Sequence, residues 1–336
     1  MLIMSNKHTP NDLKQMQSLP LEAKIVMTQQ RIRQWYEYWE GEVYVSFSGG
    51  KDSTVLKHIV DNTPGVYDVP SVFVNTGLEY PEIQKFVKDV QAGKWDCFNP
   101  EVAILRPEMR FDEVIKHYGY PAVSKMVAHS VDIARRNSEG CVAKNLFAAE
   151  KTGRFAFHKW KYLIDAPFCV SDKCCNIMKK KPSEKYAKET GRKPILGTLA
   201  EESALRYASW LKHGCSAFQG KKPSSQPMSF WTEQDVLNYL KKYNVPYCSV
   251  YGDIRVKPDA EYTLETTGCD RTGCIFCMFG CHLEKEPNRF QRLKETHPRQ
   301  YEYCINGGEM VDGKWQPSKE GLGLGKVLDY LGVNYK

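Results

Sequence analysis

A run of residues with the composition of a phosphate cradle lies near the start of the chain. The six residues Ser48-Gly-Gly-Lys-Asp-Ser53 follow an apolar stretch, residues 43–47, and lead into residues 53–60, which have helical periodicity. Two glycines let the backbone turn tightly and point several N–H groups at one spot, where a starting helix adds the positive end of its dipole. Phosphate is the natural ligand of such a loop, and Lys51 can neutralise its charge.

The spacing of this loop separates it from the commonest nucleotide-binding loop. That loop has the pattern G-x-x-x-x-G-K-S/T, whereas Lys51 directly follows the glycine pair. The hydroxyl groups of Ser48 and Ser53 can add contacts. Asp52 has two interpretations, because a carboxylate here can cap the helix together with Ser53 or hold magnesium at a triphosphate. We expect the cap, and magnesium is the alternative. A plain strand-to-helix turn would need no lysine between its glycine and aspartate residues.

Cysteines form the second group of residues able to do chemistry. Of the twelve in the chain, four fall between residues 269 and 281, and Cys174 and Cys175 are adjacent in a distant segment. The pair Cys274 and Cys277 has C-x2-C spacing, which suits one metal ion or one edge of a cluster. A local zinc site could use Cys269, Cys274, Cys277 and Cys281, with His282 as a spare ligand.

The elements around these residues predict a parallel sheet. Short apolar runs at residues 43–47, 71–74, 102–105 and 194–197 alternate with helical patterns at residues 21–39, 53–60, 81–91 and 111–118. Ligands bind at the carboxyl ends of such strands, where Ser48, Thr76 and Gly197 fall. The fold class is therefore α/β, with a doubly wound, mainly parallel sheet.

The chain falls into three predicted parts. Residues 1–40 form an N-terminal helical segment, and residues 41–260 form the nucleotide-binding α/β domain, with an insertion at about 140–180. Residues 261–336 form a cysteine-rich, metal-binding C-terminal lobe.

Composition narrows the class of protein. The 336 residues are 42% hydrophobic and 26% charged, and no apolar run has the length of a signal peptide or a membrane span. We expect a cytoplasmic, non-membrane protein, in which reduced cysteines serve metal binding or catalysis rather than disulfides. The formal charge of +7 fits anionic substrates and also nucleic acid.

Several stretches together resemble a known family. The loop is similar to the PP-loop of the ATP pyrophosphatases, whose fold is adenine nucleotide alpha hydrolase-like. Residues 73–82, the run from Gly197 to Arg206, and residues 227–251 resemble, in order, the branch of the adenylylsulfate (APS) and phosphoadenylylsulfate (PAPS) reductases. One departure is Leu199, where the family commonly carries a basic residue.

The resemblance implies an adenine nucleotide, either ATP or the sulfonucleotides APS and PAPS. Lys51 and Asp52 would be catalytic. Glu202 and Arg206 lie four residues apart, so on a helix they could instead form a surface ion pair. The residues implied in nucleotide binding are Ser48, Gly49, Gly50, Lys51, Ser53, Thr76, Gly197, Glu202 and Arg206.

The resemblance also implies a metal centre. In the adenylylsulfate reductases a Cys-Cys pair and a later C-x2-C hold a 4Fe–4S cluster, which here would use Cys174, Cys175, Cys274 and Cys277. We prefer the cluster to Zn²⁺ because adjacent cysteines are otherwise unexplained. Nearby lysines, among them Lys173 and Lys179, would also stabilise an anionic cluster.

The reductases of the family attack sulfur with a cysteine in a Glu-Cys-Gly-type tail. This sequence has no cysteine after Cys304, and its residues do not rank Cys304, Cys281 and Cys269 as substitutes. Residues 268–277 also resemble a signature of the DNA phosphorothioation enzymes.

We therefore expect an enzyme that adenylates an acceptor, converting ATP to AMP and pyrophosphate, for sulfur transfer. The resemblance implies nucleic acid as the acceptor and a cysteine desulfurase as the sulfur donor. One alternative is a divergent sulfonucleotide reductase that releases sulfite and is served by a thioredoxin-type donor. Another is a regulator that binds nucleotide or DNA without turnover.

Overall fold

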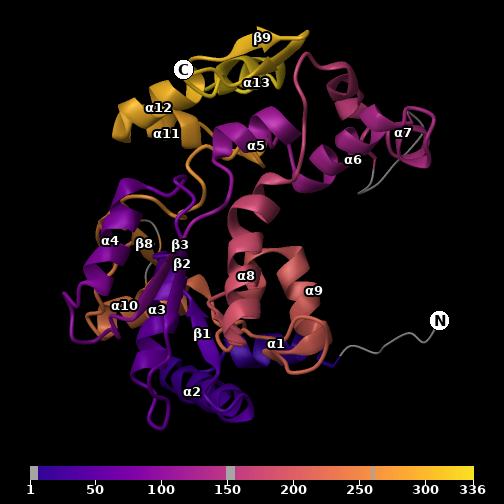
Figure 1. Ribbon diagram of the computed structural model, residues 1–336. Coiled ribbons are helices and arrows are strands. Elements are labelled where there is room, and N and C mark those ends of the chain that lie inside the picture. The colour runs from indigo at the N-terminus through magenta and orange to yellow at the C-terminus, as the bar shows by residue number, and fades with distance from the viewer. Residues whose placement is uncertain (1–6, 149–155, 259, 261) are drawn as a thin grey trace. The chain divides into compact units, whose positions relative to one another are not determined.

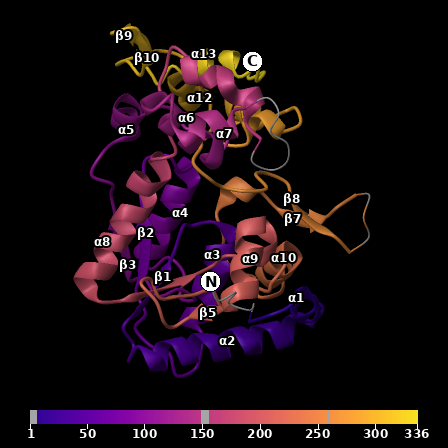
Figure 2. The same cartoon turned by 90° about the vertical axis from the view of Figure 1, so that its right-hand side faces the viewer.

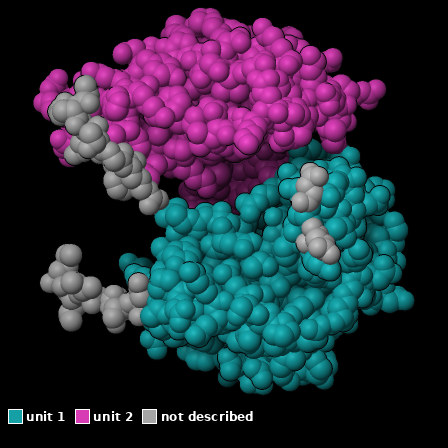
Figure 3. Space-filling view, turned by 180° about the vertical axis from the view of Figure 1, so that it is seen from behind, with its two compact units in different colours: residues 1–75, 79–105, 183–272 teal, residues 76–78, 106–182, 273–336 magenta. Residues whose placement is uncertain are grey.

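A computed structural model describes residues 7–148, 156–258, 260 and 262–336. The chain divides into two compact units, coloured separately in Figure 3. Unit 1 comprises residues 1–75, 79–105 and 183–272, and unit 2 comprises residues 76–78, 106–182 and 273–336. Each unit thus combines segments that are distant in the sequence. Among the described helices, none has both the length and the apolar character needed to cross a membrane.

A six-stranded sheet forms the centre of unit 1, with strand order β3-β2-β1-β4-β6-β5. The pairs β1–β2, β2–β3, β1–β4 and β4–β6 are parallel, and β5 pairs with β6 in the antiparallel sense. The predicted α/β class with a mainly parallel sheet is confirmed. The strands are β1 (Val43–Ser46), β2 (Ser71–Val74), β3 (Val102–Leu105), β4 (Lys193–Leu196), β5 (Ser216–Ala217) and β6 (Ser224–Ser225).

Helices cover both faces of this sheet (Figures 1 and 2). On β1, Val43 and Val45 are fully buried in the main hydrophobic core. Tyr44 alternates to the other face, where its ring lies 5.2 Å from that of Tyr186 on α8. The helices of unit 1 are α1 (Pro10–Gln17), α2 (Leu21–Tyr38), α3 (Lys51–Asp61), α4 (Pro81–Gln91), α9 (Ala204–His213) and α10 (Glu233–Lys242), and α8 (Lys181–Thr190) begins in unit 2 and continues into unit 1.

The core beside α2 includes a buried ion pair. Lys24 on α2 is 2% exposed, and its Nζ lies 2.6 Å from Asp235 Oδ2 on α10. The same carboxylate accepts from the backbone N–H of Thr232, so it also caps α10. Two other residues of α2, Ile32 and Trp35, pack into the hydrophobic core.

Three shorter elements also belong to unit 1. These are the 3₁₀ turns Ala200–Glu202 and Ser249–Tyr251 and the hairpin of β7 (Ile254–Val256) and β8 (Leu264–Thr266).

Unit 2 is mainly helical. Its core contains Tyr120, whose hydroxyl donates to the carbonyl of Leu322 at 2.8 Å. The cysteine pair Cys174-Cys175 directly precedes a π-helical turn, Asn176–Lys180. The other elements are α5 (Phe111–Tyr118), α6 (Lys125–Arg136), α7 (Cys141–Leu146), α11 (Arg289–Thr296), α12 (Pro298–Ile305), α13 (Leu324–Tyr330), the 3₁₀ segments His158–Asp165 and Cys281–Leu283, and the hairpin of β9 (Glu309–Val311) and β10 (Lys314–Gln316).

Candidate functional site

The loop between β1 and α3 is held by its own hydroxyl groups. Gly49 has a φ of +71°, a conformation that favours glycine. Ser53 Oγ accepts from the backbone N–H of Ser48 at 3.1 Å and donates to the carbonyl of Gly50 at 2.9 Å. Gly50 is the residue that caps α3, and it makes no side-chain capping bond. The predicted capping role of Asp52 and Ser53 is therefore wrong, since both lie inside the first turn of the helix.

Asp52 instead presents an unsatisfied carboxylate to the site. Its Oδ1 is buried and has no hydrogen-bond partner among the described residues. Burial is the main cause that raises the pKa of Asp52, and the charges of Lys51, Arg271 and Arg206 oppose that rise. A buried carboxylate oxygen without a hydrogen-bond partner fits a divalent cation such as Mg²⁺, which binds proteins through one or two carboxylates and takes phosphate as a further ligand.

Lys51 is fully engaged by the protein. Its side chain is 5% exposed, and its Nζ lies 2.7 Å from Glu233 Oε1 at the start of α10. The same Nζ donates to the carbonyl of Asp270. The backbone N–H of Lys51 donates to the hydroxyl of Tyr251 at 3.2 Å. A phosphate that binds this lysine would therefore compete with two protein acceptors for its three N–H donors.

A cavity of about 270 Å³ in unit 1 opens over the loop. Lys51, Arg206 and Arg271 supply positive charge to it, and Asp52 and Glu202 supply negative charge. The cavity can therefore hold an anion together with a cation. The lining residues are Ser46, Ser48, Gly50, Lys51, Asp52, Ser53, Leu196, Gly197, Thr198, Glu202, Arg206, Tyr251, Arg271 and Thr272.

The wall opposite the loop comes from the end of β4 and the start of α9. A Cβ atom on Gly197 would lie only 3.0 Å from the carbonyl oxygen of Asp52, so glycine permits the close approach of β4 to α3. Glu202 and Arg206 form the ion pair expected from their spacing, and both line the cavity. Glu202 also accepts from the backbone N–H of Leu199 at 2.8 Å. Burial lowers the pKa of Arg206, although the charge of Asp52 opposes this.

Two of the residues predicted to bind nucleotide do not line this cavity. Gly49 shapes the loop from behind, where its Cβ position would touch Ile83 and Val87. Thr76 belongs to unit 2, and its Oγ1 accepts from the backbone N–H of Leu78 at 3.1 Å. The other predicted residues of the set are brought together at the cavity.

Sequence reasoning missed six of the lining residues, namely Ser46, Leu196, Thr198, Tyr251, Arg271 and Thr272. The hydroxyl of Tyr251 lies 2.6 Å from Thr272 Oγ1, and this contact places residues 270–272 beside the loop. Arg271 and Thr272 lie between cysteines of the 269–281 segment, so they are missed when that segment is searched only for metal ligands. Leu199, by contrast, is 3% exposed and belongs to the hydrophobic core.

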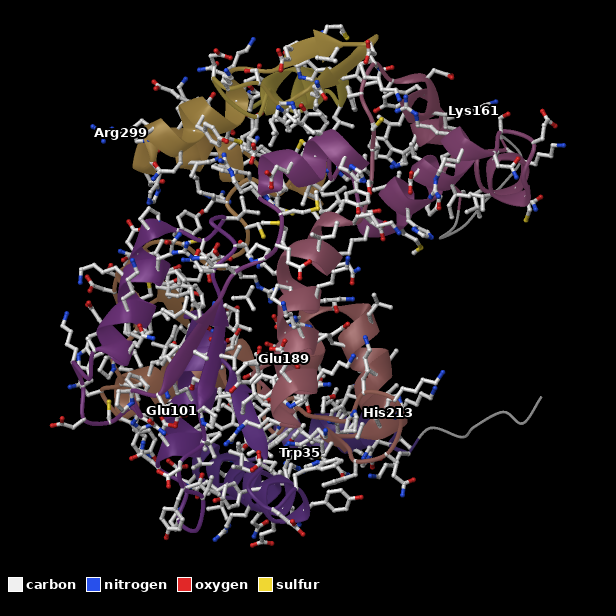
Figure 4. The ribbon with its side chains drawn as sticks, viewed as in Figure 1. Trp35, Glu101, Lys161, Glu189, His213 and Arg299 are labelled. Atoms are coloured by element: carbon white, nitrogen blue, oxygen red, sulfur yellow. The ribbon has the colours of Figure 1, made fainter. Side chains whose placement is uncertain are left out.

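The four cysteines predicted as cluster ligands gather in unit 2. The Sγ atoms of Cys174 and Cys175 are 4.0 Å apart. The nearby charges of Cys277 and Cys274 help to raise the pKa of Cys174, after the larger effects of the Cys175 contact and of burial. The contact with Cys174 in turn lowers the pKa of Cys175, assisted by the charges of Lys125 and Lys179. Figure 4 shows sulfur atoms close together below α5.

The described residues do not hold any group of three or more His, Cys, Asp or Glu side chains positioned for a metal ion. Of the alternative zinc ligands, Cys269 belongs to unit 1, whereas Cys274, Cys277 and Cys281 belong to unit 2. Cys269 Sγ donates to the carbonyl of Arg271 at 2.9 Å. His282 stacks edge-on against Trp160, with ring centroids 5.0 Å apart.

The three thiols considered as nucleophiles differ in exposure. Cys304 is fully buried on α12, and burial raises the pKa of its thiol well above the usual range. Cys281 is 1% exposed, and burial raises its pKa to about 11. Cys269 is partly exposed. Because the thiolate is the reactive form, Cys304 and Cys281 have the properties of structural cysteines.

A family model and two curated relatives match most of this chain. The family model named phosphoadenosine phosphosulfate reductase domain matches residues 42–125 and 95–279. An uncharacterized protein of Methanocaldococcus jannaschii, MJ0066, is 25% identical over 278 residues, which cover 82% of this chain and 43% of that protein. A second uncharacterized protein of that organism, MJ0973, is 21% identical over 283 residues, covering 82% of this chain and 50% of the relative. The chain thus spans half or less of these curated relatives.

Among solved structures, phosphoadenylyl-sulfate reductase from Candida auris, in a phosphate complex, has a TM-score of 0.38 and 14% identity. That likeness covers 73% of this chain and 92% of the other. Because the family model spans residues 42–279 and so most of the chain, the protein belongs to the phosphoadenosine phosphosulfate reductase domain family.

Proposed function

We propose that the protein binds ATP with magnesium in the loop cavity and transfers the adenylyl group to an acceptor. An acceptor oxygen would form a bond to the α-phosphorus, the bond between the α-phosphorus and the bridging oxygen would break, and pyrophosphate would leave with its electron pair. The observation that carries this proposal is the buried, unpartnered Oδ1 of Asp52 among three cations. An anion alone would leave that oxygen unsatisfied, whereas a nucleotide with a divalent cation would satisfy it.

The residues of the chain have distinct tasks in this proposal. The loop N–H groups and Lys51 would stabilise the charge that develops on pyrophosphate as it departs. Arg206 and Arg271 would hold the remaining phosphate oxygens, and Arg271 would supply the cation that Leu199 does not. Asp52 would hold magnesium, which neutralises phosphate charge when bound.

Sulfur transfer is the second part of the proposal. A sulfur nucleophile would attack the activated acceptor, the new bond to sulfur would form, and AMP would leave with the electron pair of the broken bond. Cys174, Cys175, Cys274 and Cys277 would hold a 4Fe–4S cluster. Their proximity within unit 2 supports this assignment. A cysteine desulfurase would supply the sulfur as a persulfide, and a dithiol would reduce the S–S bond that remains after the attack. The charge of +7 favours an anionic acceptor such as nucleic acid.

A divergent sulfonucleotide reductase is the second candidate. Membership of the family favours it, and the cationic cavity would suit a sulfonucleotide as well as ATP. Its weakness lies in the nucleophile, since Cys304 and Cys281 are buried. Cys269, which is partly exposed in the same unit as the cavity, would have to serve.

The experiment that tests the proposal separates the products of three nucleotides. Anaerobically purified protein is incubated with ATP, adenylylsulfate or phosphoadenylylsulfate, each with magnesium and a dithiol, and the products are resolved by chromatography. We expect AMP and pyrophosphate from ATP, with water standing in for the acceptor. Lys51→Ala should lower the rate by about 10²-fold or more, and Lys85→Ala, which changes an exposed lysine on α4, should not.

Two other outcomes would overturn the proposal that the protein transfers an adenylyl group. Sulfite released from either sulfonucleotide, with ATP left intact, would make the protein a reductase. Tight nucleotide binding without any product from the three substrates would indicate a regulator that binds nucleotide without turnover.

A further inference from the structure

Unit 1 contains a second cavity, of about 210 Å³, that shares no lining residue with the first. Its walls come from the segment before α1, from α2, from α9 and from the segment that carries β5. Figure 4 labels His213 at the end of α9, about one turn beyond the cavity residue Trp210. Basic and aromatic side chains dominate the walls, among them Lys7, His8, Arg31 and Phe218.

Specific contacts build this cavity. The backbone N–H of His8 donates to the carbonyl of Leu211 at 2.9 Å, which fixes the segment before α1 against α9. The His8 ring stacks on Trp210, with centroids 4.7 Å apart and planes 27° from parallel. Gly214 has a φ of +69°, and a Cβ atom there would lie 2.6 Å from His8 Nε2. The chain therefore turns at a residue without a side chain to make room for this ring.

Two buried donors at the cavity lack acceptors. Arg31 Nη1 and Trp210 Nε1 are buried and have no hydrogen-bond partner among the described residues. The guanidinium of Arg31 lies over the ring of Phe230, with its Cζ atom 4.6 Å from the ring centroid. Trp210 is 2% exposed. A buried donor without an acceptor costs free energy, and a ligand that accepts from both would recover it.

The charge of the side chains that line the cavity favours a negatively charged ligand. Lys7 and Arg31 line it, and none of the described residues of the lining carries a carboxylate. The pKa of His8 is lowered first by burial and then by Lys7, with Arg31 acting in the same direction and Asp12 against it. Positive charge with unmet N–H donors suits oxygen atoms that carry negative charge.

We propose that this cavity is a binding site for a small oxyanion, phosphate or carboxylate, held by Arg31 and Trp210 with Lys7 at its mouth. The flat faces of His8 and Phe218 would enclose the group attached to that oxyanion. The site is separate from the nucleotide cavity, so its occupation does not depend on the reaction proposed above.

The Trp210 indole N–H is a direct reporter of such binding. Full-length protein labelled with ¹⁵N at the indole nitrogen of its seven tryptophans is titrated with sodium phosphate and, separately, with sodium acetate. Sodium chloride keeps the ionic strength constant, and Trp210→Phe identifies the resonance. We expect a saturable downfield shift of this resonance with at least one of the two anions, and the same shift in Lys51→Ala, where the loop lysine is absent.

Arginine variants on one helix provide the matched control. Arg31→Gln should weaken the binding about ten-fold or more, because a charge-assisted bond is lost. Arg33→Gln, two residues along α2 and outside the cavity, should leave it unchanged. Should Arg31→Gln fail to fold, Arg31→Lys, which keeps the charge and loses the planar fork, should still bind more weakly. A resonance that shows no saturable shift with either anion, or equal affinity in both Arg31 variants and the native chain, would overturn the proposal.

Discussion

At the scale of single residues, a bound phosphate and the protein's own acceptors would compete for the ammonium group of Lys51. Its Nζ is held by Glu233, whose side chain is 42% exposed. Since an incoming phosphate would compete with that carboxylate for the Lys51 ammonium group, we expect Glu233→Gln to tighten nucleotide binding. A pair of this exposure is worth about 0–1 kcal/mol, so the gain should be about two- to five-fold. Titration with a fluorescent ATP analogue measures it.

Glu265→Gln is the matched control for this variant, because Glu265 pairs with Arg255 on the β7–β8 hairpin and does not line the cavity. It should not change the affinity. Weaker binding by Glu233→Gln would contradict the prediction and would place the carboxylate among the groups that hold the nucleotide or its cation.

The buried carboxyl of Asp52 predicts how the stability of the fold depends on pH. Burial raises the pKa of its carboxyl in the folded protein, so ionised Asp52 destabilises the ligand-free fold. That cost is absent below the unfolded pKa of about 3.9 and is complete once the pH has risen through the folded pKa. Asp52→Asn should therefore raise Tm by a few degrees at pH 7, corresponding to on the order of 1 kcal/mol. The gain should vanish below about pH 4.

Thermal melts over a pH series test this prediction. Asp253→Asn, at an exposed aspartate of the same unit, serves as the control and should leave Tm unchanged throughout. A gain for Asp52→Asn that is equally large at pH 3 and pH 7 would mean that the carboxyl does not titrate as burial requires.

Residues of the candidate site could be predicted from the sequence only where they belong to a recognisable local motif. Ser48, Lys51 and Ser53 belong to a loop that its glycine pair identifies in the sequence, and all three line the cavity. Arg271 reaches the same cavity because Thr272 contacts Tyr251, a bond across 21 residues that no local pattern encodes. The unpartnered oxygen of Asp52 is likewise a property of packing, since its sequence position equally suits a helix cap.

At the scale of elements, the contact of β4 with the start of α3 holds the cavity together. Gly197→Ala would place a Cβ atom 3.0 Å from the carbonyl oxygen of Asp52 and 3.1 Å from Ser53 Cα. Backbone atoms cannot move aside as a flexible side chain can, so α3 and its loop would have to shift. We expect a loss of about 1–3 kcal/mol in the free energy of unfolding, together with a marked loss of nucleotide affinity.

Urea unfolding and nucleotide titration measure the two effects of Gly197→Ala. Gly273→Ala is the control, because a Cβ atom there meets nothing within 4 Å and the residue has no positive φ. Equal behaviour of the two variants would show that the approach of β4 to α3 does not constrain the site.

The strands and helices were more predictable than their assembly. The helices α4 and α5 begin and end at the residues that periodicity indicates, and α3 begins two residues earlier because Gly50, rather than Asp52, caps it. Periodicity reports which side of an element is apolar, so it finds elements well. It does not report partners at long range, and for this reason the sequence contains no local sign that residues 76–78 group with residues 106–182 and 273–336.

At the scale of the whole molecule, the division of cysteines between the units separates the two metal hypotheses. All four predicted cluster ligands belong to unit 2, whereas the zinc alternative also requires Cys269 of unit 1. We expect anaerobically purified protein to contain iron and sulfide in the ratio of a 4Fe–4S cluster. Cys174→Ala and Cys277→Ala should each abolish the iron and its visible absorption, measured by elemental analysis and spectroscopy.

Cys269→Ala and Cys141→Ala complete this series of variants. Cys269→Ala should retain the iron, because its thiol bonds to the carbonyl of Arg271 and is not needed for the cluster. Cys141→Ala changes an exposed cysteine of α7 and reports any general effect of losing a thiol. Zinc that survives in Cys174→Ala and disappears in Cys269→Ala would instead establish the local site.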